Sequence, residues 1–165
     1  MNAFVIDAFE FCRLKERREG EVPVSKLPRL AAESVDGSGA LLWSLQGGSD
    51  SRGHAQMVLS VSGAVQLMCQ RCLAPFAFPL SSESVLVLAR DEASADELDA
   101  LLAEEKVEIV VGSKSFNIAD IIEDEALLAI PSSPRHEACP DRALPKQDKD
   151  VGKISPFAVL KNLKR

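Results

Sequence analysis

The chain has 165 residues, of which 46% are hydrophobic and 27% charged, and its formal net charge is −6. This hydrophobic fraction excludes wholesale disorder, and the length suits one domain with a short tail. No run approaches the roughly 18 apolar residues of a membrane span. The acidic balance excludes a general nucleic-acid binder, since such binding depends on Lys and Arg contacts to phosphates.

The first 35 residues predict a helical arm. The stretch "DAFEFCRLKERR", residues 7–18, reads as a short helix with Asp7 as its N-cap, and Gly20 follows as a stop. Residues 25–34 predict a second short helical piece. Basic side chains gather on the first helix, and we expect this basic arm to contact RNA or a partner through Arg13, Lys15, Arg17 and Arg18.

Residues 40–111 predict a sheet. Short apolar or alternating stretches are separated by Gly, Ser or Pro, which is typical of antiparallel strands joined by hairpins. The stretches are 40–46, 54–63, 64–69, 76–80, 84–90 and 107–111. Gly63 is expected at a hairpin corner or a bulge. The resulting fold class is α+β, with an antiparallel sheet that is open or barrel-like.

Two further segments predict helix. Residues 91–105 carry seven carboxylates and indicate a solvated acidic helix or a mobile loop. Residues 117–130 predict the one long helix of the C-terminal half, with Asn117 as N-cap and Pro131 as stop. Glu125 falls within its apolar stripe, where a carboxylate needs a partner, and Arg71 is one candidate. The polar face of this helix is predicted to hold Asp120, Glu123 and Asp124, and the apolar face Ile118, Ile121, Ile122, Leu128 and Ala129.

The C-terminal residues predict a tail. We expect residues 1–139 to form a single α+β domain and residues 140–165 to form a flexible linker with an amphipathic peptide. The peptide "SPFAVLKNLKR", residues 155–165, has an N-cap serine and a basic last turn. It either docks on a partner or packs on its own domain. Its contact residues are predicted to be Phe157, Leu160, Lys161, Lys164 and Arg165.

The motif "CQRC" suggests three kinds of chemistry. Cys69 and Cys72 have the spacing that lets two thiolates face one tetrahedral metal, and His136 with Cys139 offers a second half-site. The four would make a Cys3His structural zinc site, although the halves must be brought together by the fold. The alternatives are reduced thiols at a turn, or a dithiol redox pair.

Catalytic groups are scarce in this sequence. The chain has two histidines and no tyrosine, and it lacks a P-loop, a G-x-S-x-G elbow and an H-E-x-x-H helix. The acidic run could hold Mg²⁺ in a nuclease only if its carboxylates were fixed on rigid elements. The sequence shows no secretory signal and no apolar span, so a cytoplasmic protein with no membrane contact is expected. Because catalytic groups are scarce, we expect that the protein is not an enzyme and has no small-molecule substrate.

Three stretches together resemble one protein family. "LMCQRCLAPF", "IEDEALLAIPSSPRHEAC" and "SPFAVLKNLKR" are similar, in order and spacing, to the YceD proteins, which are large ribosomal RNA subunit accumulation proteins. The resemblance implies a factor for 23S rRNA accumulation. It also marks the positions Cys69, Arg71, Cys72, Glu123, Asp124, Glu125, Pro131, Pro134, His136 and Cys139.

The expected function is therefore non-enzymatic assistance in 23S rRNA accumulation, processing or large-subunit assembly, with rRNA or a ribosomal or rRNA-processing protein as partner. Structural zinc is the cofactor to test, and Arg71, Glu123, Asp124, Glu125, Pro131 and Pro134 are expected to specify the structure or a partner. The alternatives are a thiol oxidoreductase, a metal-dependent ribonuclease acting on rRNA precursor, and a zinc-stapled protein adaptor.

Overall fold

The computed structural model describes residues 4–140, which form an α+β fold with two sheets. The elements in chain order are β1 (Val5–Ile6), α1 (Ala8–Arg13), β2 (Arg17–Pro23), the 3-10 turn η1 (Val24–Lys26), α2 (Pro28–Glu33), β3 (Ala40–Ser49), β4 (Ala55–Met68), β5 (Pro75–Ala89), α3 (Glu92–Leu101), β6 (Glu108–Val111), β7 (Phe116–Asn117) and α4 (Ile118–Ala129).

The main sheet has five strands in the order β2-β3-β4-β5-β6, and β1 pairs with β7 in a separate antiparallel ribbon. The first four strands of the main sheet are antiparallel, while β6 runs parallel to β5 after the α3 crossover. The prediction of a purely antiparallel sheet is therefore wrong at β6, because a helical connection returns the chain to the same edge in the same direction. In residues 4–140 the sheet is open rather than barrel-like, since β2 and β6 do not pair with each other.

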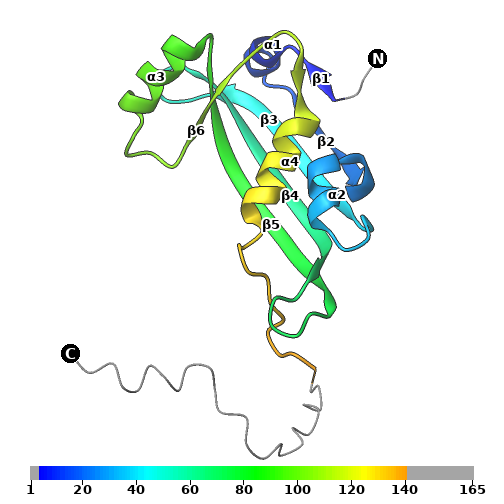
Figure 1. The fold of residues 1–165 in the computed structure, drawn as a ribbon. Coiled ribbons are helices and arrows are strands. Elements are labelled where there is room, and N and C mark those ends of the chain that lie inside the picture. The colour runs from blue at the N-terminus through cyan, green and yellow to red at the C-terminus, as the bar shows by residue number, and fades with distance from the viewer. Residues whose placement is uncertain (1–3, 141–165) are drawn as a thin grey trace, which may run out of the picture.

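The core lies between one face of this sheet and the helices. Alternate residues of β4, such as Met57, Leu59 and Val61, are buried, as expected for a strand with one covered face. Ile118 and Ile122 of α4 complete the same cluster. Figure 1 shows α4 lying along the sheet with α2 beside it, while the long β4–β5 hairpin extends beyond them.

The predicted helical arm is partly wrong. Asp7 does cap α1 by accepting a hydrogen bond from the Glu10 amide at 3.1 Å, but the helix ends at Arg13. Lys15 has a φ of 52°, which reverses the chain, and the following residues pair with β3 as strand β2. Gly20 lies inside this strand against the indole of Trp43 instead of ending a helix.

Gly63 lies in mid-strand and not at a hairpin corner, because β4 continues through it from Ala55 to Met68. An added Cβ at this position would lie 2.6 Å from the carbonyl oxygen of Ala40 on β3. The glycine therefore permits a close approach of two backbones rather than a turn.

The two later helices are of similar length, so a single long helix does not stand out. α3 has 10 residues and α4 has 12. α3 confirms the expected acidic helix, and Asp91 and Ser94 form its capping box. In α4, Asn117 is the N-cap as predicted, accepting from the Ala119 amide. Two face assignments are wrong: Leu128 is 73% exposed, and Glu123 is buried with 4% exposure.

Candidate metal centre

The tip of the β4–β5 hairpin is a tight turn that presents two thiols. The Cys69 amide donates to the Ala74 carbonyl at 3.0 Å, and the Leu73 amide donates to the Cys69 carbonyl at 2.9 Å. Leu73 has a φ of 59°, a left-handed conformation that closes the turn. This backbone folds Cys72 back toward Cys69.

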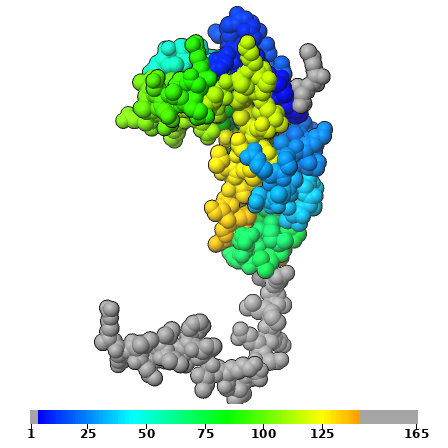
Figure 2. Space-filling view, turned by 45° about the horizontal axis from the view of Figure 1, so that its top comes forward, coloured from blue at the N-terminus to red at the C-terminus, as the bar shows by residue number. Residues whose placement is uncertain are grey.

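The loop after α4 brings the second half-site to this turn. The Gln70 amide donates to the Pro134 carbonyl at 2.9 Å, which fastens the loop to the hairpin. The ring of His136 packs on Phe76 with centroids 4.6 Å apart. Figure 2 shows residues 131–140, in orange, against the hairpin tip, in green, at the end of the molecule opposite α3.

The four predicted ligands converge, with their ligand atoms all within 4.8 Å of one another: Cys69, Cys72, His136 and Cys139. The sulfurs of Cys69 and Cys139 lie 3.7 Å apart, and Nδ1 of His136 lies 3.4 Å from Cys72 Sγ and 3.9 Å from Cys139 Sγ. A zinc tetrahedron with Zn–S bonds of about 2.3 Å and a Zn–N bond of about 2.0 Å has edges of about 3.8 Å and 3.5 Å. The sulfur–sulfur separation and the shorter nitrogen–sulfur separation match those edges, while the longer nitrogen–sulfur separation exceeds its edge by about 0.4 Å.

The electrostatics of the cluster favour thiolate at one position. Burial opposes ionisation of Cys69, but backbone amide hydrogen bonds from Cys72, His136 and Arg71 outweigh it and lower the pKa of Cys69 to about 5. Burial and the neighbouring sulfurs raise the pKa of Cys72. Metal binding would require deprotonation of each thiol.

Arg71 lies beside the cluster and not beside Glu125. Its Nε donates to Cys139 Sγ at 3.0 Å, and this contact raises the pKa of the guanidinium. The hypothesis that Arg71 pairs with Glu125 is wrong. Glu125 is buried and accepts a hydrogen bond from the Ser82 hydroxyl of β5.

Glu123 joins α4 to α2. Its carboxylate accepts from the amides of Arg29 and Leu30, at 2.6 and 3.0 Å, and from Arg29 Nε at 2.9 Å. α2 has no capping side chain of its own, so a residue 94 positions away supplies the cap. Asp124 binds the same guanidinium at 2.7 Å. These contacts fix α4, and Pro131 and Pro134 then lie on the loop that leads to His136.

The predicted basic arm has acidic neighbours within the fold. Arg13 pairs with Glu10, Arg17 with Glu19 at 3.0 Å, and Arg18 with Glu16 at 3.8 Å. Lys15 is exposed on the turn between α1 and β2. These three ion pairs reduce the positive field that phosphate binding would need. The predicted contacts Phe157, Leu160, Lys161, Lys164 and Arg165 lie outside the described residues.

Two residues that shape this region have weak signals in the sequence. Arg29 follows Pro28 at the start of α2, and the lack of a capping residue before this proline is the one hint that a distant group completes the helix end. In the sequence Phe76 reads only as an alternating residue at the start of β5, and its packing on His136 depends on the tertiary fold.

Comparisons with known proteins give one match. A family model described as "Large ribosomal RNA subunit accumulation protein YceD" matches residues 57–164. The matched range contains both halves of the Cys3His cluster, α3 and α4. Neither a curated protein nor a solved structure matches the chain. No helix among residues 4–140 is long and apolar enough to cross a membrane.

Proposed function

Because the chain belongs to the YceD family of large ribosomal RNA subunit accumulation proteins, we propose that it is a non-catalytic factor for 23S rRNA accumulation, acting in processing or large-subunit assembly. We propose that a structural zinc ion stabilises its fold. The observation that carries this proposal is the convergence of Cys69, Cys72, His136 and Cys139 from segments 64 to 70 positions apart.

The residues fit zinc in number, kind and charge. Three thiolates and one imidazole are a set that structural zinc sites use, and four protein ligands leave no open position for a substrate or a water. Three thiolates around Zn²⁺ leave one net negative charge, and the Arg71 guanidinium at the cluster offsets it. When bound, the ion would cross-link the hairpin tip to the loop after α4.

The remaining surface supports binding rather than catalysis. Residues 1–140 contain 22 Asp and Glu against 12 Lys and Arg, whereas residues 141–165 contain seven basic and three acidic residues. The acidic part of the chain suits contact with a basic ribosomal protein. The basic C-terminal segment suits contact with rRNA or a partner. Among residues 4–140 no carboxylate-rich group converges as the Cys3His group does, which disfavours a metal-dependent nuclease.

Zinc content tests the metal centre. We expect one zinc per purified full-length chain by elemental analysis, and a loss of at least nine-tenths of it in Cys69→Ser. Cys12→Ser is the matched control, because Cys12 is buried on α1 and donates to the Gln56 carbonyl, away from the cluster. Zinc-free wild-type protein, or equal zinc in Cys69→Ser, would refute the centre. A thiol oxidoreductase would instead show catalytic turnover of a disulfide substrate.

Depletion in cells tests the function. We expect loss of the protein to lower mature 23S rRNA relative to 16S rRNA, with rescue by the wild-type chain and by Cys12→Ser but not by Cys69→Ser. An unchanged 23S to 16S ratio would contradict the assembly proposal. Cleavage of 23S precursor by the pure protein would instead support the alternative of a metal-dependent ribonuclease.

A further inference from the structure

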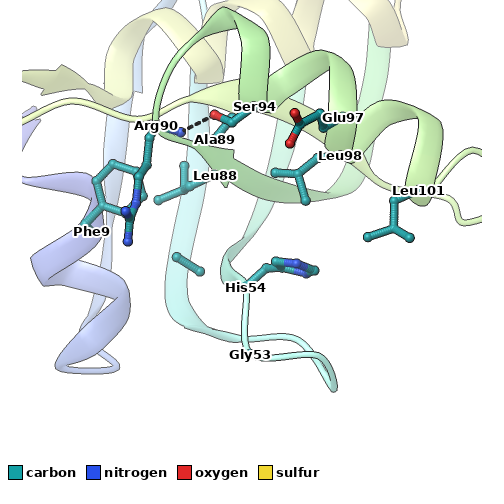
Figure 3. Close-up of a pocket in the computed structure, with 11 residues that line it drawn as sticks. Phe9, Gly53, His54, Leu88, Ala89, Arg90, Ser94, Glu97, Leu98 and Leu101 are labelled. Atoms are coloured by element: carbon teal, nitrogen blue, oxygen red, sulfur yellow. Dashed lines mark hydrogen bonds between the residues drawn. The ribbon is translucent and has the colours of Figure 1, made fainter.

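An open groove lies at the end of the molecule opposite the metal centre. Its volume is about 480 Å³, and α1, the start of β4, the end of β5 and α3 contribute its walls. Figure 3 shows Leu98 and Leu101 pointing into it from α3, with Phe9 on the opposite wall and His54 below. The candidate metal centre uses none of these residues.

The apolar side of the groove is incompletely covered. α3 packs on β5 and β6, yet none of its ten residues is buried, and Leu101 is 58% exposed. A surface helix normally buries its apolar stripe against its own core. Here Leu98 and Leu101 face a cavity that also exposes Phe9, so the stripe is available to another chain.

The charge at this groove is negative. Residues 91–105 carry seven carboxylates and no Lys or Arg, and Glu97 lines the groove itself. The basic groups nearby are partly neutralised: His54 binds Asp50 through Nδ1 at 2.7 Å, and Arg52 binds Glu105 at 2.6 Å. Arg90 remains on the wall beside Phe9. An apolar floor with an acidic helix as its rim complements a segment that is basic and amphipathic.

We infer that this groove binds a basic amphipathic segment of another protein. Large apolar side chains of the segment would contact Leu98, Leu101 and Phe9, and its Lys and Arg would lie along the carboxylates of α3. This inference rests on the proposed assembly function for the identity of the partner, because proteins that bind rRNA are rich in Lys and Arg. A ribosomal protein is the class that fits.

The chain's own basic segment is a poor occupant for geometric reasons. The groove begins at Ala55 and the metal centre follows Met68, so the 14 residues of β4 separate them by about 45 Å. The connection from Cys139 to Ser155 has 16 residue steps, which reach about 53–58 Å when fully extended. Binding within one chain would therefore need a largely extended connection, which lowers the effective concentration.

The test measures peptide binding to the full-length chain. The probe is a fluorescent 14-residue peptide of Leu and Lys with Leu at i, i+3, i+4 and i+7 spacing, and its match replaces every Lys by Glu. Leu101→Glu tests the apolar wall against Leu128→Glu, an exposed leucine on α4. Glu97→Lys tests the rim against Glu21→Lys, an exposed glutamate on β2 with the same change in net charge.

We expect Leu101→Glu and Glu97→Lys each to weaken Kd at least tenfold by fluorescence anisotropy, while the two control variants change it less than threefold. The Glu-containing peptide should bind at least a hundredfold more weakly. Thermal melts of all four variants check that they are folded. Equal effects of test and control variants, or equal binding of the two peptides, would overturn the inference.

Two further outcomes would assign the groove to another occupant and overturn the inference as stated. If Phe157→Asp tightens peptide binding tenfold, the chain's own segment competes for the groove. If the protein is a dimer that Leu101→Glu converts to a monomer, a second copy covers it. The binding assay contains no rRNA, so a lack of peptide binding would contradict the groove inference without bearing on the 23S rRNA proposal. An unchanged 23S rRNA level would contradict the proposed function without bearing on peptide binding.

Discussion

Glu123→Ala should destabilise the fold because the buried carboxylate of Glu123 caps a helix that is distant in sequence. The carboxylate is 4% exposed and accepts three hydrogen bonds from the start of α2, two of them from backbone amides that have no other cap. Loss of a helix cap costs about 1 kcal/mol, and loss of buried hydrogen bonds to a charged group costs about 1.5–3 kcal/mol. The ion pair itself adds little, because the Arg29 side chain is 54% exposed. We therefore expect a loss of about 3 kcal/mol.

The assay is urea unfolding of the full-length chain followed by circular dichroism. Asp124→Ala is the matched control, because Asp124 is the next residue, binds the same guanidinium at 2.7 Å and is 53% exposed. It should cost less than about 1 kcal/mol. Glu123→Gln should fall between the two, since it keeps one acceptor oxygen for the amides. If the unfolding free energies of Glu123→Ala and Asp124→Ala differ by less than about 0.5 kcal/mol, the cap that Glu123 supplies to α2 does not stabilise the fold.

Three other predictions concern packing, charge and the metal. Gly63→Ala should cost about 2 kcal/mol because its Cβ would lie 2.6 Å from the Ala40 carbonyl oxygen, whereas Gly48→Ala, with no atom within 4 Å, should be near neutral in the same unfolding assay. Burial and the charges of Glu125 and Asp124 raise the pKa of Glu108 in the folded chain. The free energy of unfolding therefore falls as the pH rises from the ordinary glutamate pKa through the raised pKa, because the folded chain must then ionise a group that it holds better when protonated. Glu108→Gln should thus raise the urea midpoint at pH 7 and give no gain below the ordinary glutamate range; a gain independent of pH would contradict this. Arg71→Ala should weaken zinc retention about tenfold against a competing chelator, since it removes the cation at Cys139, whereas Arg135→Ala, on the loop after α4, should leave retention unchanged.

The grouping of the four candidate ligands could be predicted because each half of the cluster carries its own local signal. Two ligands three positions apart are recognisable at Cys69 and Cys72, and again at His136 and Cys139, without any knowledge of the fold. The caps of α1 and α4 were predictable for the same reason, since Asp7 and Asn117 act within three residues.

The features that the sequence did not reveal depend on contacts between distant segments. β2 is polar and contains Gly20, and its strand conformation comes from pairing with β3 rather than from propensity. Glu123 reads as a solvent-facing residue of α4 until α2 is placed beside it. The groove is assembled from four elements, so no single stretch predicts it.

The 70 positions that separate Cys69 from Cys139 would make metal binding at the candidate centre a late event in the life of each chain. In the chain-entropy account, a cross-link that closes a loop of about 70 residues restricts the unfolded chain by about 4 kcal/mol. During synthesis a nascent chain holds only two of the four candidate ligands until residue 136 has emerged, and the set is complete at residue 139. Ion uptake would then report that translation has passed α4 and that the hairpin tip and the loop after α4 have met.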